Sequence, residues 1–99
     1  MALNESRSWL IAYDIADPRR LARVHRYLKG EAVPVQYSIF AANTSANGIR
    51  RVRDELAKRI DPRRDDVRIY LLPCPLDISH LGQPFLPEGL LLPNIAPLA

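Results

Sequence analysis

The sequence has 99 residues, of which 47% are apolar and 25% are charged. This length supports one hydrophobic core, which excludes a multidomain enzyme, and the composition is typical of a globular protein. A domain of this size buries only about two-thirds of the surface that its unfolded chain exposes, so a deep private pocket is not expected. We therefore predict an oligomer in which subunits share a surface.

The net charge of +3 divides unevenly along the chain. Residues 1–68 hold all 14 Lys and Arg against nine acidic residues, a net charge of +5, whereas residues 69–99 carry a net charge of −2. Twelve of the basic residues are arginine, the side chain that binds phosphate through paired hydrogen bonds. A polyanionic partner and a solvated basic face both explain this pattern, and charge alone does not separate them.

The lengths of the apolar runs and the cysteine content bear on the cellular location of the protein. No run approaches the length of a transmembrane helix or of a signal-peptide core, so we expect no membrane partner. The one cysteine, Cys74, cannot form an internal disulfide, and no Cys/His spacing typical of a metal site occurs. These features predict a cytoplasmic protein in which Cys74 is a half-buried small apolar residue.

The first predicted elements are a strand and a helix. Residues 8–14 form a short run of aromatic and branched residues, which is typical of a central strand covered on both faces. Asp17 then suits the N-cap of a helix and Pro18 its first position. We expect this helix to continue to about Lys29 and to stop at Gly30.

This helix is predicted to be amphipathic, with His25 packing beside its apolar stripe. Three apolar residues recur at helical spacing and predict the buried face: Leu21, Val24 and Leu28. Three cations fall together on the opposite side and form what we call the arginine stripe: Arg19, Arg23 and Arg26. The arginine stripe is our candidate for nucleic-acid binding.

Residues 33–43 alternate as a strand does, although the pattern leaves open whether they form one bent strand or two short ones. Pro34 must lie at an edge or at a strand start. A second helix is predicted from the polar stretch 43–48 to near Ile60. The buried face of this helix is predicted to hold Ile49, Val52, Leu56 and Ile60. A last strand is predicted over residues 67–72.

The order of these elements predicts an α+β fold, a ferredoxin-like βαββαβ sandwich over residues 1–72 with both helices on one face of the sheet. Residues 73–99 differ, because they contain six of the nine prolines, no basic residue and many apolar ones. We expect this segment to be buried, with residues 89–92 as a short strand added to an exposed sheet edge, either of this subunit or of its partner.

Asp14 is the candidate catalytic and metal-binding residue, because it ends a predicted central strand just before a helix. The alternative is that it caps the following turn, a role for which Asp17 is better placed. One aspartate does not make a metal site, but a two-fold dimer can bring two Asp14 side chains together. Mg²⁺ or Mn²⁺ bound there would polarise a phosphoryl oxygen and activate water.

Three blocks of the sequence carry a resemblance to a known family. They are residues 9–15 with Asp17 after them, residues 35–40, and residues 66–70, in that order. Together they resemble the small CRISPR-associated protein of the spacer-acquisition module, CRISPR-associated protein two, which is the partner of the integrase of that module.

The resemblance implies a homodimer of ferredoxin-like subunits with an extra C-terminal strand that packs at the dimer and docks the integrase. It implies a scaffold for spacer DNA and a metal-dependent endonuclease acting on RNA or double-stranded DNA. Asp14 matches the metal-binding aspartate of the family, and Tyr13, Arg23 and Phe40 match positions tied to activity. Pro34 stands where a basic residue often precedes the second block.

Three classes of function therefore compete. One is an Mg²⁺-dependent phosphodiesterase with paired Asp14 residues as metal ligands, and the second is a non-catalytic dimeric scaffold in CRISPR adaptation that binds duplex DNA by its arginines and the integrase by its tail. The third is a ferredoxin-like regulatory or interaction module without nucleic-acid chemistry, which predicts a pocket instead of a basic stripe. Tyr13 and Phe40 would pack against a sheet face in any case.

Overall fold

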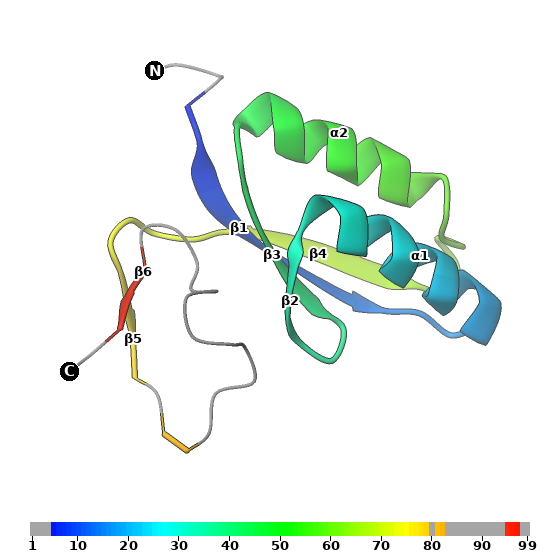
Figure 1. Ribbon diagram of the computed structural model, residues 1–99. Helices are drawn as coiled ribbons and strands as arrows, with labels where there is room; N and C mark the ends of the chain where they lie inside the picture. The colour runs from blue at the N-terminus through cyan, green and yellow to red at the C-terminus, as the bar shows by residue number, and fades with distance from the viewer. Residues whose placement is uncertain (1–4, 80, 83–94, 98–99) are drawn as a thin grey trace.

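The computed structural model describes residues 5–79, 81–82 and 95–97. Their elements are, in chain order, β1 (Arg7–Asp14), α1 (Pro18–Glu31), β2 (Val33–Gln36), β3 (Ile39–Thr44), α2 (Ala46–Ala57), β4 (Asp66–Leu71), β5 (Leu76–Ile78) and β6 (Ile95–Pro97). The first four strands form one antiparallel sheet in the order β2-β3-β1-β4, and both helices cover the same face of it (Figure 1). This arrangement confirms the predicted ferredoxin-like βαββαβ sandwich.

Strand β1 lies in the centre of the sheet, as predicted, and pairs with β3 on one side and β4 on the other. Ile11 faces Phe40 across one ladder and Ile69 across the other. Ile11 is 0% exposed and Phe40 is 1% exposed, so this row forms the middle of the core beneath the helices. Because side chains alternate along a strand, the intervening residues of β1 point to the face without helices.

Helix α1 begins as predicted and ends later. The Asp17 carboxylate accepts hydrogen bonds from the backbone N–H groups of Arg19 and Arg20, both at 3.0 Å. The prediction that Gly30 stops the helix is wrong, because the helix continues to Glu31. Gly30 has an ordinary backbone conformation, and the chain leaves the helix through the extended Ala32 directly into β2.

The buried face of α1 is narrower than predicted. Val24 and Leu28 are 0% exposed, but Leu21 is 37% exposed and is not a core residue. Leu21 lies on the side of the helix that faces the turn between β2 and β3, so the sheet does not cover it. The apolar stripe of this helix is therefore partly open at its N-terminal end.

Helix α2 has the predicted core face but is shorter than expected. The Ser45 hydroxyl caps it by accepting from the backbone N–H of Gly48 at 3.0 Å. Its regular part ends at Ala57, and turn residues lead from there to Pro62. Three of the four predicted core positions are buried, and Ile60 is half-buried: Ile49, Val52 and Leu56 are 7%, 6% and 2% exposed.

Residues 33–44 form two strands, which settles the question left open by the sequence. Edge strand β2 carries Pro34, where the missing N–H is tolerated, and Tyr37 and Ser38 form the turn into β3. Ser38 has a φ of 60°, and its carbonyl accepts a hydrogen bond from the backbone N–H of Tyr13 at 3.0 Å. This bond ties the tip of the hairpin to the central strand.

Strands β5 and β6 pair with each other in parallel and form a second, separate sheet. They stand apart from the helices in Figure 1. The predicted strand at 89–92 lies outside the described residues. Among the helices that the structure describes, none has the length and apolar character needed to cross a membrane.

Candidate nucleic-acid interface and metal site

Asp14 is the last residue of β1, and its side chain is exposed. Its neighbour Tyr13 is buried in the core on the helix side, so alternation places the Asp14 carboxylate on the face of the sheet without helices. Across the ladder it faces Asp66, the first residue of β4. Directly opposed residues in such a ladder have Cβ atoms about 5 Å apart, so two carboxylates share this end of the sheet.

The two carboxylates differ in what they already bind. Asp66 accepts a hydrogen bond from Arg68 Nε at 3.0 Å, whereas the Asp14 carboxylate has no polar partner within the described part of the chain. Mg²⁺ takes one or two carboxylates and completes its shell with water and phosphate oxygens, which is a set that Asp14 fits. The described residues include no cluster of three or more potential metal ligands. One chain therefore supplies one free carboxylate to such a site.

Tyr13 and Phe40 do come together, on the opposite side of the sheet from Asp14. Their rings are stacked with centroids 6.2 Å apart, and the His25 ring meets Phe40 edge-on at 5.4 Å. The Tyr13 hydroxyl lies 3.4 Å from His25 Nδ1. Burial raises the pKa of Tyr13, so at neutral pH it is a neutral phenol that can donate or accept a hydrogen bond.

The arginine stripe lies on the outer surface of α1. All three of its side chains are exposed, and none forms a salt bridge within the described residues. Helical spacing places them away from the buried Val24 and Leu28, and therefore away from the sheet. Within one chain the arginine stripe and Asp14 thus lie on opposite sides of the sheet, so they do not form one site.

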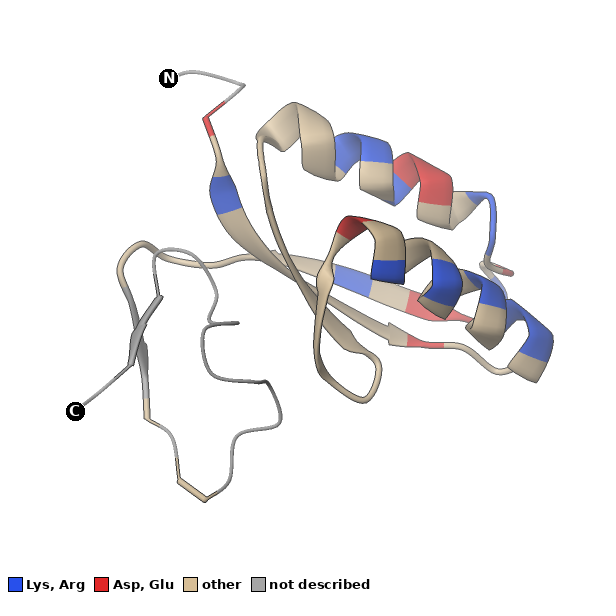
Figure 2. Ribbon diagram, in the orientation of Figure 1, with Lys and Arg blue, Asp and Glu red and all other residues tan. Residues whose placement is uncertain are grey.

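Most of the positive charge belongs to the helical layer. Of the 14 basic residues, 12 lie in α1, in α2 or in the segment between α2 and β4, and strands β1 and β4 carry one each. Figure 2 shows this distribution, with basic residues spaced along both helices and none on β2 or β3. The outer face of the two helices is thus the basic face of the subunit.

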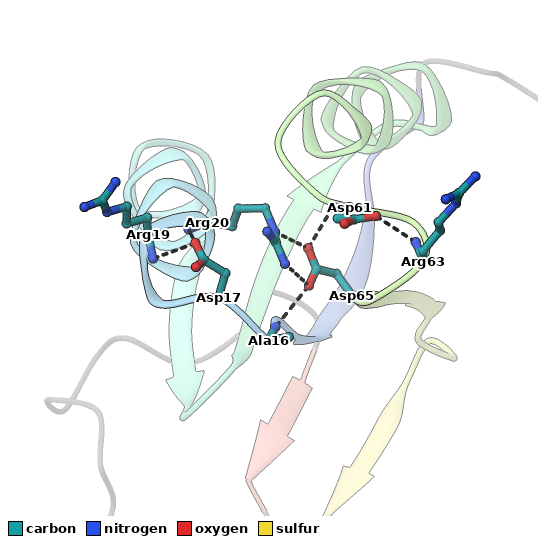
Figure 3. Close-up of polar contacts among 7 residues, drawn as sticks. All are labelled: Ala16, Asp17, Arg19, Arg20, Asp61, Arg63 and Asp65. Atoms are coloured by element: carbon teal, nitrogen blue, oxygen red, sulfur yellow. Dashed lines mark hydrogen bonds and ion pairs between the residues drawn. The ribbon is translucent and has the colours of Figure 1, made fainter.

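Sequence reasoning missed one polar centre, which joins α1 to the loop before β4 (Figure 3). The Asp65 side chain is 0% exposed and accepts hydrogen bonds from Arg20 Nε at 2.8 Å and Nη2 at 3.1 Å. It also accepts from the backbone N–H groups of Ala16 at 3.0 Å and Asp61 at 2.7 Å. Asp65 is 45 residues from Arg20 in the chain, so no local spacing could have indicated this pair.

The hydrogen bonds from Arg20, followed by those from the backbone N–H groups of Asp61 and Ala16, hold the pKa of Asp65 well below its usual range. The carboxylate is therefore ionised at every physiological pH, and its bonding capacity is used within the fold. Arg20 is likewise committed to Asp65, whereas Figure 3 shows Arg19 pointing away from this centre. Asp65 is a structural residue.

Comparisons with known proteins agree with this architecture. The family model described as CRISPR associated protein Cas2 matches residues 7–74. A protein of Nitrosomonas europaea named CRISPR-associated endoribonuclease Cas2 1 is 43% identical over 82 residues, which cover 83% of this chain and 78% of that protein. One from Thermodesulfovibrio yellowstonii, named CRISPR-associated endoribonuclease Cas2 2, is 43% identical over 74 residues, which cover 75% of this chain and 81% of that protein.

Solved structures give the same result. A crystal structure of a hypothetical protein from Thermus thermophilus superposes with a TM-score of 0.72 at 29% identity, covering 84% of this chain and 99% of that one. The crystal structure of Streptococcus pyogenes Cas2 at pH 6.5 gives a TM-score of 0.61 at 27% identity, covering 67% and 86%. The chain therefore belongs to the CRISPR-associated protein Cas2 family.

Proposed function

We propose that this protein acts in CRISPR spacer acquisition as a dimeric scaffold that binds duplex DNA through the arginine stripe. We also propose that it is an Mg²⁺- or Mn²⁺-dependent endonuclease that cleaves RNA or double-stranded DNA. The observation that carries the scaffold role is the arginine stripe itself: three exposed arginines on one helix face without an ion-pair partner in the described chain. Guanidinium groups of this kind bind phosphate oxygens.

The proposed dimer rests on the face of the sheet that the helices leave uncovered. By alternation this face carries Leu10, Ala12 and Ile39, which are partly exposed, and Tyr70, which is 48% exposed. A subunit of 99 residues gains stability by covering such a face with a second copy. In a two-fold dimer through this face, the arginine stripes of both chains stay on the outside, free for DNA.

The proposed metal site follows from the same dimer. Asp14 lies on the uncovered face, so a two-fold axis through that face can bring the two Asp14 carboxylates together. A divalent ion held there would polarise a phosphoryl oxygen and lower the pKa of bound water. Asp66 is held by Arg68, so Asp14 is the residue of this pair that is free to bind.

We further propose that residues 73–99 dock the integrase. Two features support this: the segment contains no basic residue, and among the described residues β5 and β6 pair only with each other, which leaves each with an edge where a further strand could be added. Cys74 is exposed, so the prediction that it is half-buried is wrong, and its free thiol suits the reducing cytoplasm in which we place the protein.

The test of the enzyme role is Asp14→Ala in a series with and without Mg²⁺ on RNA and on duplex DNA. Loss of the metal ligand should reduce cleavage to background, because the phosphoryl oxygen is no longer polarised. Asp54→Ala is the matched control, since it removes an exposed carboxylate from α2 and should leave cleavage unchanged. Spacer acquisition with the integrase should survive Asp14→Ala, and an acquisition defect would show that the scaffold role depends on the metal site.

The test of the dimer is Tyr70→Glu, measured by the molar mass in solution. A buried, unpaired carboxylate on the proposed interface should convert the dimer to a monomer at micromolar concentration. Tyr37→Glu is the matched control, because Tyr37 is 97% exposed at the turn between β2 and β3, away from that face. A Tyr70→Glu protein that keeps the mass of a dimer would exclude this interface.

A further inference from the structure

A groove of about 600 Å³ lies between the N-terminal half of α1 and the turn from β2 to β3. Its walls are mostly apolar and are lined by Leu21, Pro34 and three residues that carry rings: Tyr13, His25 and Tyr37. No acidic residue lines it. The groove explains why Leu21, at a helix position predicted to be buried, is 37% exposed.

Two of these three residues have ring contacts in the fold, and the third lies on a turn that is tied to the sheet. His25 is exposed, but its ring contacts Phe40 edge-on at 5.4 Å and its Nδ1 lies 3.4 Å from the Tyr13 hydroxyl. Tyr37 is 97% exposed, and the next residue, Ser38, is tied to β1 through the backbone of Tyr13. An almost fully exposed aromatic ring on a fixed turn offers an open stacking surface.

Cations adjoin the groove along the same helix. Arg26 comes four residues after Ala22, and Lys29 comes four residues after His25, so each adjoins a lining residue on the helix surface. Both cations are exposed, and neither forms a salt bridge within the described residues. A groove with aromatic rings, adjacent cations and no acidic lining residue complements a nucleotide. The base can stack on the rings, and the phosphate can form an ion pair with a cation.

We propose that this groove binds an unpaired nucleobase at a single-stranded end of the DNA, stacked on Tyr37 and His25 with its phosphate on Arg26 or Lys29. The inference rests on the proposed DNA-binding role and extends it, because a duplex alone offers no free base to this groove. Stacking accepts any base, so the groove selects for unpaired structure and not for sequence.

The experiment compares two duplexes that carry overhangs of equal length, one with normal bases and one with abasic sites, so that the phosphate charge is the same. The wild type should bind the normal overhang more tightly by roughly 5- to 150-fold, the range expected for one stacked base. Tyr37→Ala and Tyr37→Leu should remove this difference, whereas Tyr37→Phe should keep it. A 2-aminopurine in the overhang should be quenched by the wild type and by Tyr37→Phe only.

The outcomes separate this site from the wider proposal. If the wild type binds both duplexes equally, the base site is excluded while DNA binding stands. If the wild type binds neither duplex at low salt, DNA binding itself is excluded. If Tyr37→Leu binds and quenches as the wild type does, the groove is an apolar surface for a protein segment, and the base site is overturned. Thermal midpoints of the three variants should match the wild type, because Tyr37 is almost fully exposed.

Discussion

Arg20 and the arginine stripe lie on the same helix but serve different purposes. Arg20 donates two hydrogen bonds to the fully buried carboxylate of Asp65, so its binding capacity is used inside the fold. Arg23, three residues later, is exposed and has no acidic partner within the described chain. A guanidinium that is already paired with a carboxylate binds phosphate less strongly. Whether an arginine has an acidic partner therefore indicates whether it is available to bind DNA, and a basic stretch of sequence alone does not.

Two carboxylates show the same contrast. Asp65 accepts four hydrogen bonds and is 0% exposed, whereas Asp14 is exposed and has no polar partner for its side chain within the described residues. A carboxylate that is already satisfied stabilises the fold, and one that is unsatisfied at the end of a central strand is free to bind a metal ion. The following experiments test whether this division between structural and binding residues is correct.

The largest effect is expected from Arg20→Ala. This change leaves the Asp65 carboxylate buried without its guanidinium, and it should lower the thermal midpoint by roughly 10 °C. Arg19→Ala is the control on the same helix turn and should shift the midpoint by no more than about 3 °C. Equal midpoints for the two variants would contradict the structural role of Arg20.

The next effect is on the dependence of stability on pH. The folded-state pKa of Asp65 is depressed, so its contribution to stability is complete above the unfolded-state pKa of about 3.9 and is lost as the pH falls further. Wild-type stability should therefore drop steeply below about pH 4. Asp65→Asn should be less stable at pH 7 and should show a shallower drop in acid, as measured by urea unfolding at a series of pH values.

A smaller effect is expected from Arg23→Ala, on DNA affinity alone. Removing one phosphate contact should lower the slope of log affinity against log salt by about 0.9. The thermal midpoint should not change, because Arg23 contacts no acidic residue in the described chain. An unchanged salt slope would show that the arginine stripe is only a solvated face.

The smallest effect is expected from Lys58→Ala. Lys58 Nζ lies 2.7 Å from Glu55 Oε2, which is about as short as the 2.8 Å contact between Arg20 and Asp65, but the Lys58 side chain is 71% exposed. Exposed ion pairs contribute little, so the midpoint should shift by about 2 °C or less in differential scanning calorimetry. A shift as large as that of Arg20→Ala would mean that burial does not distinguish the two pairs.

Much of the fold could be predicted because its signals are local. A short apolar run identified β1, and alternation identified the strands over 33–43 and 67–72, whereas β5 and β6 were not predicted. Helical spacing identified Val24 and Leu28, and the Asp17-Pro18 pair marked the start of α1. Gly30 misled because a glycine ends a helix only where the chain turns into the left-handed conformation, and here the chain leaves through an extended Ala32. The backbone conformation at the end of a helix depends on the position of the strand that follows it.

The candidate site was predictable only in part. The position of Asp14 at the end of the central strand followed from the sequence pattern, and so did the exposure of the arginine stripe. The sequence pattern did not show that Asp14 and the arginine stripe lie on opposite sides of the sheet, because this depends on which face the helices cover. The groove beside Leu21 was missed for the same reason, since its second wall is the turn between β2 and β3.

The sequence by itself determined the order of the elements up to β4, most of the core stripe of each helix and the separation of a basic body from a proline-rich tail, because these properties are set by a few neighbouring residues. Only the tertiary structure decided which charged side chains form ion pairs within the fold and which remain available to bind a ligand. Arg20 meets Asp65 across 45 residues, while Arg23 meets no acid in the part of the chain that the structure describes. Ion pairing depends on distance in space, which the chain fixes only after it has folded.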